Sequence, residues 1–482
     1  MAEDYDLIVV GGGAAGLAAA QAGAAARART LLASAGETGG ECTFTGCVPS
    51  KTLIEAAARG ATFEAAMTAV HQAVAAIAAT ETPDVLGRHG IEVLRGHAAF
   101  RSPREVTVDG RVLRARGFVL ATGSRPAVPP LPGLAGLPYL TNENVFELDA
   151  LPASLAVLGG GAVGCELAQA FGRLGAAVTV IEAATRLLPA ADPATSKLIG
   201  EIFAREGITV RTGTAVEKID NMPNGPGFTL HLHDTPPVVA GSLLVAAGRT
   251  PVTDDLGLDH AGVSVDERGA VITDARLATT APGIYAAGDV TGLMPFTHAA
   301  YAMGRLAARS ALRNRWSPAG RFSTRAIPWV VFTDPEVAQV GLTEEQAAAE
   351  RGARVAYLPL REVDRAVTAG GTEGFVKIIA GPRRAVGNLG GGRVLGATIV
   401  ASRAGEMIDE VALAMRAGVF TGRLAQTVHA YPTWSLAIQQ AAAQFFGGGY
   451  GDRAARPVSG PPRQANASPR RLIPRWRAAR SR

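Results

Sequence analysis

The pattern of apolar and polar positions begins with a short strand. Residues 5–10 form an apolar run that is typical of a buried β-strand. A glycine-rich turn follows at residues 11–16, and then an alanine-rich segment to about residue 26 predicts a helix. A second apolar run ends near residue 34. This order predicts a βαβ unit, in which the two strands are parallel neighbours.

The same pattern recurs farther along the chain. Residues 155–158 form an apolar run, residues 159–164 a glycine-rich turn, and residues 165–174 a helical segment. A further strand is expected at residues 178–182. Both turns read Gly-x-Gly-x-x-Gly, and here the glycines allow close approach of a pyrophosphate to the helix N-terminus. The chain is therefore expected to bind two dinucleotides, a flavin and a nicotinamide.

The two units differ at the end of their second strand. Glu182 follows Gly159 by 23 residues, where a carboxylate can bind both ribose hydroxyls of a dinucleotide. The equivalent position of the first unit is Ser34, which offers only a hydroxyl. We expect the first site to hold its ribose less tightly, or to use another group such as Glu37.

Other segments complete the predicted organisation. Residues 118–126 are a strand leading into a tight turn, and residues 283–289 are a strand that ends on Asp289. The Asp289 carboxylate can accept a hydrogen bond from a sugar-like hydroxyl or, alternatively, cap a helix. From about residue 321 the pattern changes to an α+β module without a nucleotide fingerprint. Its expected elements are strands at 327–332, 355–359, 374–379 and 394–400, and helices at 406–417 and 436–446.

Composition limits the class of protein. Hydrophobic residues make up 48% of the 482 positions, enough for several cores. No apolar run reaches the ~20 residues of a membrane span. The start of the chain lacks the basic region of a signal peptide, and the three cysteines do not form a disulfide scaffold. We therefore expect a cytoplasmic protein.

Positive charge is concentrated at the C-terminal end. The net charge is +5, but residues 451–482 contain nine arginines and one aspartate, so the rest of the chain is slightly acidic. This segment is also rich in proline and poor in aliphatic residues, which predicts a disordered tail. Such a tail can contact nucleic acid or anionic lipid, or can be a solvated extension without a role. Nothing else in the sequence indicates a nucleic-acid or membrane partner.

Two of the three cysteines, Cys42 and Cys47, lie close together after the first glycine-rich turn. Such a pair can alternate between dithiol and disulfide and so pass on two electrons. Five residues of ideal helix rise roughly 7.5 Å, whereas a disulfide needs its Cα atoms within about 7 Å. We therefore expect the backbone to bend at Gly46, with Pro49 in the first turn of a new helix and Cys47 near its N-terminus. The alternative is a pair of buried cysteines that never react.

The cysteine segment resembles a known redox motif. Residues 39–51, Gly-Gly-Glu-Cys-Thr-Phe-Thr-Gly-Cys-Val-Pro-Ser-Lys, are similar to the active-site segment of the class I pyridine nucleotide-disulfide oxidoreductases. That family includes dihydrolipoamide dehydrogenase, glutathione reductase and mercuric reductase. The resemblance covers roughly residues 5–450. The other segments that resemble family signatures are residues 121–126, 246–251, 286–289 and 332–341.

The resemblance implies an α/β fold with two Rossmann-like dinucleotide-binding domains and a C-terminal α+β dimerisation domain. It implies FAD and either NADH or NADPH as cofactors, a homodimer as the assembly, and no resident metal. The implied domains are an FAD-binding domain at 1–150 that continues at 275–320, an NAD(P)-binding domain at 151–274, a dimerisation domain at 321–450 and the basic disordered tail at 451–482. The candidate cofactor-binding residues are Gly11, Gly13, Ala14, Ala15, Gly16, Ser34, Lys51, Thr122, Gly123, Ser124, Gly159, Gly161, Gly164, Glu182, Gly248 and Asp289.

The resemblance also implies roles in electron transfer. NAD(P)H reduces FAD, and reduced FAD reduces the disulfide, with Cys47 facing the flavin as charge-transfer thiolate and Cys42 meeting the substrate. Lys51 and Glu166 match the family's ion pair beside the flavin, where an ammonium stabilises the reduced flavin anion. For both residues the alternative is an ordinary charge on a helix surface.

The C-terminal segment departs from the disulfide reductases of this family. Many of these carry a histidine and a glutamate that serve the partner's interchange thiol, and the corresponding residues here are Tyr431 and Leu436. A tyrosine with its ordinary pKa near 10 is a poor proton shuttle. His429, displaced by two residues, is either structural or a substitute on a different backbone path. Mercuric reductases are similar in placing a tyrosine in this segment, and a soft cation held by two thiolates needs no proton shuttle.

These features predict an FAD-dependent NAD(P)H oxidoreductase, closest to mercuric reductase, with catalytic residues Cys42, Cys47, Lys51, Glu166 and Tyr431. The substrate would be a thiophilic metal ion or a related small acceptor, although residues 451–482 lack the cysteine pair that delivers metal in mercuric reductases. The alternatives are a dihydrolipoamide dehydrogenase or other disulfide reductase, and a low-turnover flavin redox sensor or binding protein.

The nicotinamide preference follows from the end of the second unit's strand. Glu182 is expected to favour NADH, because a carboxylate repels the 2′-phosphate of NADPH. Arg186, four residues later, could partly offset that repulsion.

Overall fold

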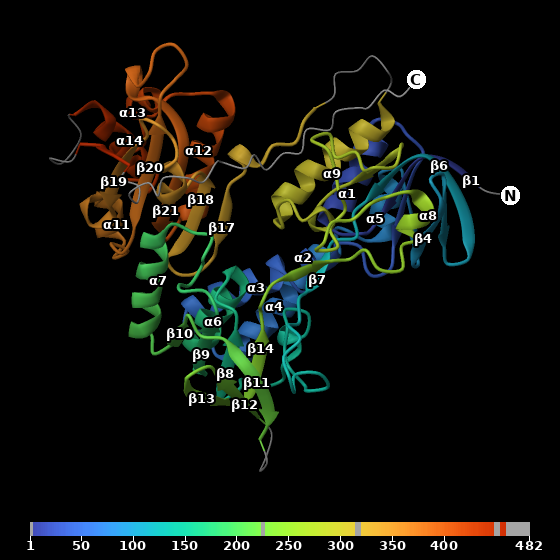
Figure 1. Ribbon diagram of the computed structural model, residues 1–482, viewed down its shortest axis with the longest axis horizontal. Helices are drawn as coiled ribbons and strands as arrows, with labels where there is room; N and C mark the ends of the chain where they lie inside the picture. Colours follow the sequence, from blue (N-terminus) through green and yellow to red (C-terminus); the bar gives the residue numbers. More distant parts are fainter. Residues whose placement is uncertain (1–2, 223–226, 314–319, 448–453, 459–482) are drawn as a thin grey trace.

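The computed structural model describes residues 3–222, 227–313, 320–447 and 454–458. Its first part is a mostly parallel sheet (Figure 1). The strands are β1 (Glu3–Val10), β2 (Thr30–Ser34), β3 (Ile91–Arg95), β4 (Ala98–Ser102), β5 (Glu105–Val108), β6 (Arg111–Leu120) and β16 (Ile284–Ala286). Their order is β3-β2-β1-β6-β5-β4, with β16 also paired to β6. β1 is parallel to both of its neighbours, so the first expected βαβ unit is present.

Helices α1 (Ala14–Ala25) and α9 (Thr297–Leu312) lie side by side against this sheet (Figure 1). Their contact is built largely from alanines, among them the buried Ala15, Ala19, Ala300 and Ala307. Small side chains let two helices approach closely, and this contact carries the start of α9 to the cysteine segment. The other helices of this part are α2 (Gly40–Phe44), α3 (Cys47–Ala58), α4 (Phe63–Ala78) and α5 (Pro83–Arg88).

The second part repeats the parallel arrangement, as expected. Its elements are β8 (Ser154–Leu158), α6 (Ala162–Arg173), β9 (Ala177–Glu182), α7 (Pro193–Arg205), β10 (Thr209–Thr212) and β14 (Ser242–Val245). The strand order is β10-β9-β8-β14, and every pair is parallel. An antiparallel sheet of β11 (Val216–Asn221), β12 (Phe228–Leu232) and β13 (Thr235–Ala240) is added to it. The strands β7 (Ser124–Pro126) and β15 (Arg249–Pro251) pair where the chain passes between the two parts.

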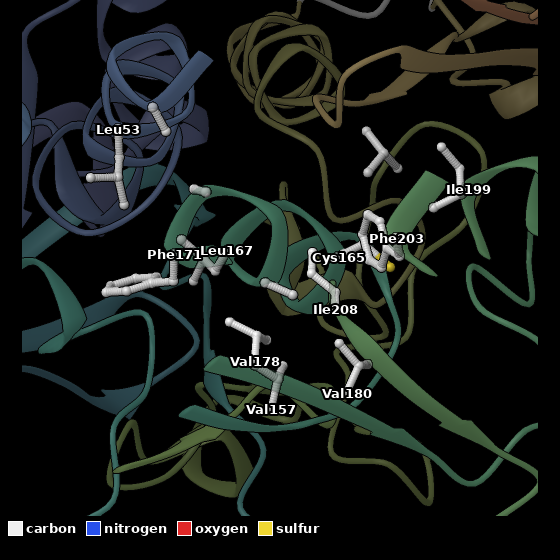
Figure 2. Packing of buried hydrophobic residues seen from close by; sticks show 14 of the residues in the cluster. Leu53, Val157, Cys165, Leu167, Phe171, Val178, Val180, Ile199, Phe203 and Ile208 are labelled. Carbon is white, nitrogen blue, oxygen red and sulfur yellow. The ribbon is translucent and has the colours of Figure 1, made fainter. Parts of the chain in front are cut away.

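A hydrophobic cluster joins the first two parts. Figure 2 shows Leu53 of α3 above Phe171 and Leu167 of α6, with Val157 and Val178 of the sheet beneath them. These side chains are at most 3% exposed. The helix that begins at Cys47 is therefore packed against the helix that follows the second glycine-rich turn, and this packing positions the site described below.

The third part is an antiparallel sheet with helices. Its order is β17 (Trp329–Val331), β18 (Glu336–Gly341), β21 (Arg393–Ala401), β20 (Phe375–Gly381), β19 (Arg354–Pro359) and β22 (Arg456–Pro457). The helices are α10 (Glu344–Ala347), α11 (Asp364–Thr368), α12 (Ala404–Ala417), α13 (Thr421–Gln426) and α14 (Leu436–Ala443). The expected strands at 355–359, 374–379 and 394–400 are confirmed. Strand β18 and helix α13 were not expected. In β18, buried residues on both faces hide the alternation of apolar and polar residues that is typical of a strand.

The expected start of the returning segment of the first part, at residue 275, is wrong. Leu256, Val263, Val271 and the short helix α8 (Leu258–Ala261) pack in the same core as β1 and β6. The chain therefore returns to the first part soon after β15. The chain passes from the second part back to the first through the short strand β15, which pairs with β7. The amino-acid composition does not change at this point, so nothing in the sequence signals the boundary.

The prediction of a disordered tail is wrong for residues 454–458. Strand β22 pairs antiparallel with the edge strand β19, and Arg456 forms an ion pair with Glu344 at 2.6 Å. An edge strand offers unpaired backbone groups, so even a polar arginine-proline segment can add to it. The rest of the predicted tail, residues 451–453 and 459–482, lies outside the described residues.

Candidate active site

The two close cysteines lie on either side of a break between helices. Cys42 is in α2 and Cys47 is the first residue of α3, with Gly46 between the two helices. A Cβ at Gly46 would lie 2.8 Å from the carbonyl oxygen of Glu41, so the close approach of the two turns requires glycine. The expected bend is confirmed, and Pro49 lies in the first turn of α3.

Thr297 contacts both sulfur atoms. Its Oγ1 lies 3.2 Å from Cys47 Sγ and 3.4 Å from Cys42 Sγ. Both cysteines are partly buried and are free thiols in this structure. Because Thr297 begins α9 and Cys47 begins α3, the Cys47 sulfur lies near two helix N-termini, whose dipoles favour a thiolate.

The two thiols differ in acidity. The hydrogen bond from the Cys42 thiol, helped by the Thr297 hydroxyl and the Lys51 ammonium, outweighs burial and lowers the pKa of Cys47 from 9.0 to about 6. The same hydrogen bond, together with burial, raises the pKa of Cys42 far above its usual range. At neutral pH the reduced pair therefore carries one thiolate, on Cys47, and one proton, on Cys42. Burial also raises the pKa of Cys165, which lies in the core apart from this pair.

The expected pairing of Lys51 with Glu166 is present. Lys51 Nζ lies 2.8 Å from Glu166 Oε2, while the other carboxylate oxygen accepts the Phe332 backbone N–H at 2.8 Å. Only 5% of the Glu166 side chain is exposed, so this is not a helix-surface charge. The Lys51 ammonium also lies over the Phe332 ring, 4.7 Å from its centroid. These contacts hold a positive charge beside the cysteines.

A cavity of about 850 Å³ opens beside the cysteine pair. A cavity of this size can hold most of a cofactor. Helix α1 begins at its edge without a side-chain cap, so backbone N–H groups are available to a pyrophosphate. At Gly11 φ is +114°, and a Cβ there would collide with the Ala121 carbonyl. Besides Cys42, Cys47 and Glu166, the predicted residues that line the cavity are Gly11, Gly13, Ala14, Ala15, Ser34, Lys51, Thr122, Gly123, Ser124 and Asp289.

At the end of β2 and just after it, Ser34 and Glu37 both line the cavity. The Ser34 hydroxyl donates to the Gly36 carbonyl at 2.9 Å, which leaves its oxygen lone pairs for a ligand. Glu37, the expected substitute, forms an ion pair with Arg95 at 2.8 Å. Gly16 does not line the cavity. A Cβ at Gly16 would lie 1.8 Å from the Gly11 carbonyl oxygen, so glycine is needed here for close packing of the helix against the preceding turn.

A polar network crosses the cavity next to Cys42. Asp289 accepts a hydrogen bond from the Ser124 hydroxyl at 2.6 Å and does not cap the helical turn that begins there. Arg249 Nε donates to the Ser124 oxygen at 2.7 Å, and its guanidinium pairs with Glu41. Asn142 donates to the same Glu41 carboxylate at 2.6 Å. Burial raises the pKa of Glu41 despite these partners.

The second glycine-rich turn forms a separate site. Helix α6 begins after Gly161 without a side-chain cap. Both carboxylate oxygens of Glu182 accept backbone N–H groups at 2.7 Å, one from Gly160 and one from Ala184. The carboxylate is thereby held at the start of α6, where a dinucleotide ribose would lie. Gly164 closes the turn against the Gly159 carbonyl.

Two other predicted positions have partners outside the second glycine-rich turn. Arg186 donates to the Pro189 carbonyl at 3.1 Å and pairs with Glu345 of the third part at 3.2 Å. Its charge is therefore engaged elsewhere and is not directed at Glu182. Gly248 lies just before β15, where its carbonyl accepts the Ala127 N–H at 2.9 Å, and it does not line the cavity beside the cysteines.

One chain does not bring Tyr431 to the cysteines. Tyr431 lies between α13 and α14, is 70% exposed, and donates to Asp364 at 2.7 Å. His429 is buried close by, with Nδ1 2.9 Å from the Thr427 carbonyl and Nε2 3.0 Å from Glu410. Its imidazole is thus held inside its own domain, which favours the structural interpretation of His429.

Sequence reasoning missed Thr297, Glu41, Arg249 and Asn142. Glu41 and Arg249 lie inside the recognised motif segments, and a charged residue directly before Cys42 was a signal that could have been used. Thr297 and Asn142 are ordinary polar residues in unremarkable local sequence, and only the packing of α9 and of the loop after β7 brings them to the site.

No described helix is long and apolar enough to cross a bilayer. Within the same described ranges, no group of three or more His, Cys, Asp or Glu side chains is arranged to hold a metal ion.

Comparison with known proteins follows the same division of the chain. Residues 5–304 match the sequence family of the pyridine nucleotide-disulphide oxidoreductases. Residues 327–442 match the dimerisation domain of the same proteins. The chain is 37% identical to a dihydrolipoyl dehydrogenase of Thermus scotoductus, over 91% of this chain and 96% of that protein. It is also 37% identical to a mercuric reductase of Streptomyces lividans, over 92% and 96%.

A solved structure extends the likeness to three dimensions. The HOCl-induced flavoprotein disulfide reductase RclA of Escherichia coli, in a Cu(II) complex, superposes with a TM-score of 0.81. The two sequences are 29% identical, and the match covers 92% of this chain and 99% of that one.

Proposed function

The chain belongs to the class I pyridine nucleotide-disulfide oxidoreductases, an enzyme family whose members use FAD and NAD(P)H, and we propose that it reduces a thiophilic metal ion through Cys42 and Cys47. The observation that carries the proposal is that Tyr431 stands where many disulfide reductases of the family have their acid–base histidine, while Nε2 of His298, which lines the cavity beside the cysteines, is engaged with the Pro328 carbonyl at 2.6 Å. The one histidine of the C-terminal segment, His429, is buried against Glu410. Because the relatives of this chain are enzymes, they give no support to the alternative of a low-turnover flavin redox sensor or binding protein.

When bound, FAD supplies two-electron transfer between a nicotinamide and the cysteine pair. The uncapped start of α1 would bind its pyrophosphate, and Asp289 with Ser124 would bind hydroxyls farther along the cavity. Lys51 and Thr297 keep Cys47 as a thiolate, and Cys42 holds the proton until a substrate arrives. A metal ion that binds both sulfurs displaces that single proton.

The replacement of the family's acid–base histidine by Tyr431 affects two kinds of substrate differently. Reducing a disulfide releases a thiolate that must be protonated, whereas a soft metal ion held by two thiolates takes up electrons without a proton. The similarity to a mercuric reductase and to a protein solved in a Cu(II) complex supports the second kind. We therefore propose as acceptor one Hg(II) ion, which takes both electrons of the cysteine pair, or two Cu(II) ions, each of which takes one electron.

The dimerisation domain supports a homodimer. We further propose that Tyr431 reaches the partner's cavity across the interface. The exposure of Tyr431 at 70% and of Val428 at 91%, three residues earlier, supports an interface at this loop.

Dihydrolipoamide oxidation is the second candidate function. It is favoured by the identity of 37% with the Thermus dihydrolipoyl dehydrogenase and by the presence of a His–Glu pair, His429 with Glu410, in the C-terminal segment. For this function the pair would have to leave its buried position or act through the partner's interface.

The substrate proposal predicts a large ratio of rates in the wild-type enzyme. With NADH as donor, kcat/KM for Hg(II) or Cu(II) should exceed that for lipoamide by about 100-fold, the contribution typical of a missing general acid. Anaerobic steady-state assays with the three acceptors measure the ratio. A ratio that favours lipoamide would make the protein a lipoamide dehydrogenase. Comparable rates for all three acceptors would mean that the replacement of the histidine by Tyr431 does not decide the substrate, and would contradict the proposal.

Glu182 should make the enzyme prefer NADH. We expect kcat/KM for NADH to exceed that for NADPH by about tenfold or more, because the fixed carboxylate faces the position of a 2′-phosphate. Glu182→Ala should narrow the difference. Arg186→Ala is the matched control and should leave it unchanged, since Arg186 pairs with Glu345. A preference for NADPH in the wild type would contradict this assignment.

The thiolate of Cys47 should titrate near pH 6. Its pKa is lowered to about 6, so the long-wavelength thiolate-to-flavin absorption of the two-electron-reduced enzyme should persist at pH 7–8 and fade as the pH falls through about 6. Thr297→Val should raise the midpoint by about one pH unit, since a hydrogen bond to a charged group is lost. Thr297→Ser retains the hydroxyl and should restore the wild-type midpoint. An unchanged midpoint in the valine variant would exclude Thr297 from this role.

A further inference from the structure

Helix α2, which carries Cys42, is too short to hold its own position. It has five residues, and no side chain caps its start. Isolated helices shorter than about 12 residues are marginal in water. The position of the Cys42 sulfur therefore depends on the side chains that hold α2 from outside.

One buried amide holds both ends of α2. The Nδ2 group of Asn142 donates to Glu41 Oε1, in the first turn, at 2.6 Å and to the carbonyl of Thr45, the C-cap, at 3.2 Å. Asn142 is only 9% exposed, so water does not replace these bonds easily. A further contact, from the Thr43 hydroxyl to Glu81 at 2.8 Å, holds the middle of the helix. Because Asn142 binds both ends, α2 cannot shift along its axis without losing one of the two bonds.

The segment that carries Asn142 is anchored to the second part. The Leu140 N–H donates to the Leu243 carbonyl at 2.7 Å, and the Leu140 carbonyl accepts the Val245 N–H at 2.7 Å, so this segment is bonded to β14. Val145, three residues after Asn142, is fully buried in the cluster that joins the first two parts. Asn142 thus fixes α2 to a strand of another domain.

We propose that Asn142 is a positioning residue of the redox pair, which keeps the Cys42 sulfur where it can form a disulfide with Cys47. A disulfide needs its Cα atoms within about 7 Å, whereas two free thiols tolerate any separation. In the reduced pair seen here, the Thr297 hydroxyl lies 3.4 Å from the Cys42 sulfur and 3.2 Å from the Cys47 sulfur. The thiols are therefore already held side by side, and Asn142 stabilises the disulfide relative to the dithiol.

The redox step that this geometry supports balances in electrons and protons. On reduction the S–S bond breaks, and the pair takes up two electrons and one proton from reduced FAD, which gives a thiolate on Cys47 and a thiol on Cys42. On oxidation two electrons pass to the acceptor, the Cys42 proton is released to solvent and the S–S bond forms. This inference rests on the redox pair of the proposed function but not on the identity of the acceptor.

The redox equilibrium of the pair tests the inference. The holoenzyme is equilibrated anaerobically with mixtures of NADH and NAD⁺, quenched in acid and labelled at its thiols, which are counted per bound FAD. Asn142→Leu removes both donors at similar side-chain size. It should shift the equilibrium about tenfold toward the dithiol, since a hydrogen bond to a charged group is lost. This shift corresponds to a potential about 30 mV more positive for a two-electron couple.

A second variant and a matched control use one and the same substitution. Asn142→Asp keeps the shape of the side chain but loses its donors, and it should shift the equilibrium by at least as much. Asn144→Asp makes this change two residues later, on an exposed side chain that does not contact α2. Its Oδ1, which accepts the Thr141 N–H at 2.8 Å, is retained, so this variant should keep the wild-type equilibrium.

A double variant tests the route through Glu41. Asn142→Leu combined with Glu41→Ala should shift the equilibrium by less than the sum of the two single shifts, because the two residues share one hydrogen bond. Additive shifts would overturn this route. If Asn142→Leu does not fold with FAD, Asn142→Asp decides by the same criterion.

The other outcomes overturn the inference or the function on which it rests. A wild-type equilibrium in both Asn142 variants, a shift toward the disulfide, or an equal shift in Asn144→Asp would each overturn the positioning role. A preference of the wild type for lipoamide over Hg(II) would overturn metal reduction and leave this inference standing. If NADH releases no thiols in the wild type beyond that of Cys165, the pair is not redox-active and both proposals fail.

Discussion

Cys47→Ser should abolish the long-wavelength absorption of the two-electron-reduced enzyme and lower turnover with every acceptor by about 10³-fold or more. The reason is that Cys47 is the only thiolate of the reduced pair, held by the Cys42 thiol, Thr297 and Lys51. Cys42→Ser should lower turnover to a similar degree but keep the absorption, because a serine hydroxyl can still donate to the Cys47 sulfur. Anaerobic titration with NADH, followed by absorbance, measures both effects.

Cys165→Ala provides the control for loss of a cysteine as such. Cys165 is buried in the core of the second part, away from the pair, so this variant should keep both the absorption and most of the turnover, with only a modest loss of stability. If Cys42→Ser and Cys47→Ser behave alike in the titration, the proposed division of roles between the two cysteines is wrong.

Lys51→Met should have the second largest effect. It would leave the buried Glu166 carboxylate without its ammonium partner and should destabilise the protein by about 3 kcal/mol, the lower end of the range for breaking a buried pair, because a third of Lys51 is exposed. Turnover should fall about 100-fold, because the positive charge beside the cysteines is lost. The midpoint of the Cys47 titration should also rise, since the ammonium lowers that pKa. Denaturant unfolding, steady-state assays and the pH titration measure the three effects.

Lys197→Met is the matched control for this change. Lys197 and Glu201 form an exposed pair on α7 at 3.9 Å, and such pairs contribute less than about 1 kcal/mol. Equal losses in Lys51→Met and Lys197→Met would mean that the Lys51–Glu166 pair has no special weight in stability.

Much of the fold was predictable because its determinants are local. Glycine spacing, the apolar runs on either side and the helix after each turn are readable within about 30 residues, and both parallel units were found as expected. Antiparallel strands buried on both faces give weaker patterns, so β18 was missed. Edge pairing is weaker still, and nothing local in residues 454–458 announces the strand β22.

The candidate active site also contains features that local sequence predicts and features that depend on contacts between distant residues. The pairing of Lys51 with Glu166 was expected only because the chain resembles a family, since 115 residues separate the two and no local pattern links them. Thr297 was not expected at all, although it contacts both sulfurs. Arg186 was expected to offset Glu182, but contact with the third part directs it to Glu345.

By itself the sequence determined which groups can carry the chemistry: a close cysteine pair interrupted by Gly46, two dinucleotide turns, a single ribose carboxylate at Glu182, and a tyrosine in place of a histidine at position 431. These are matters of residue type and short-range spacing. Only the tertiary structure decided the acidity of each thiol, the burial of His429 against Glu410 and the partnership of Tyr431 with Asp364. The physical reason is that pKa values and side-chain orientation depend on charges, donors and desolvation supplied by elements far apart in the chain, which meet only after packing.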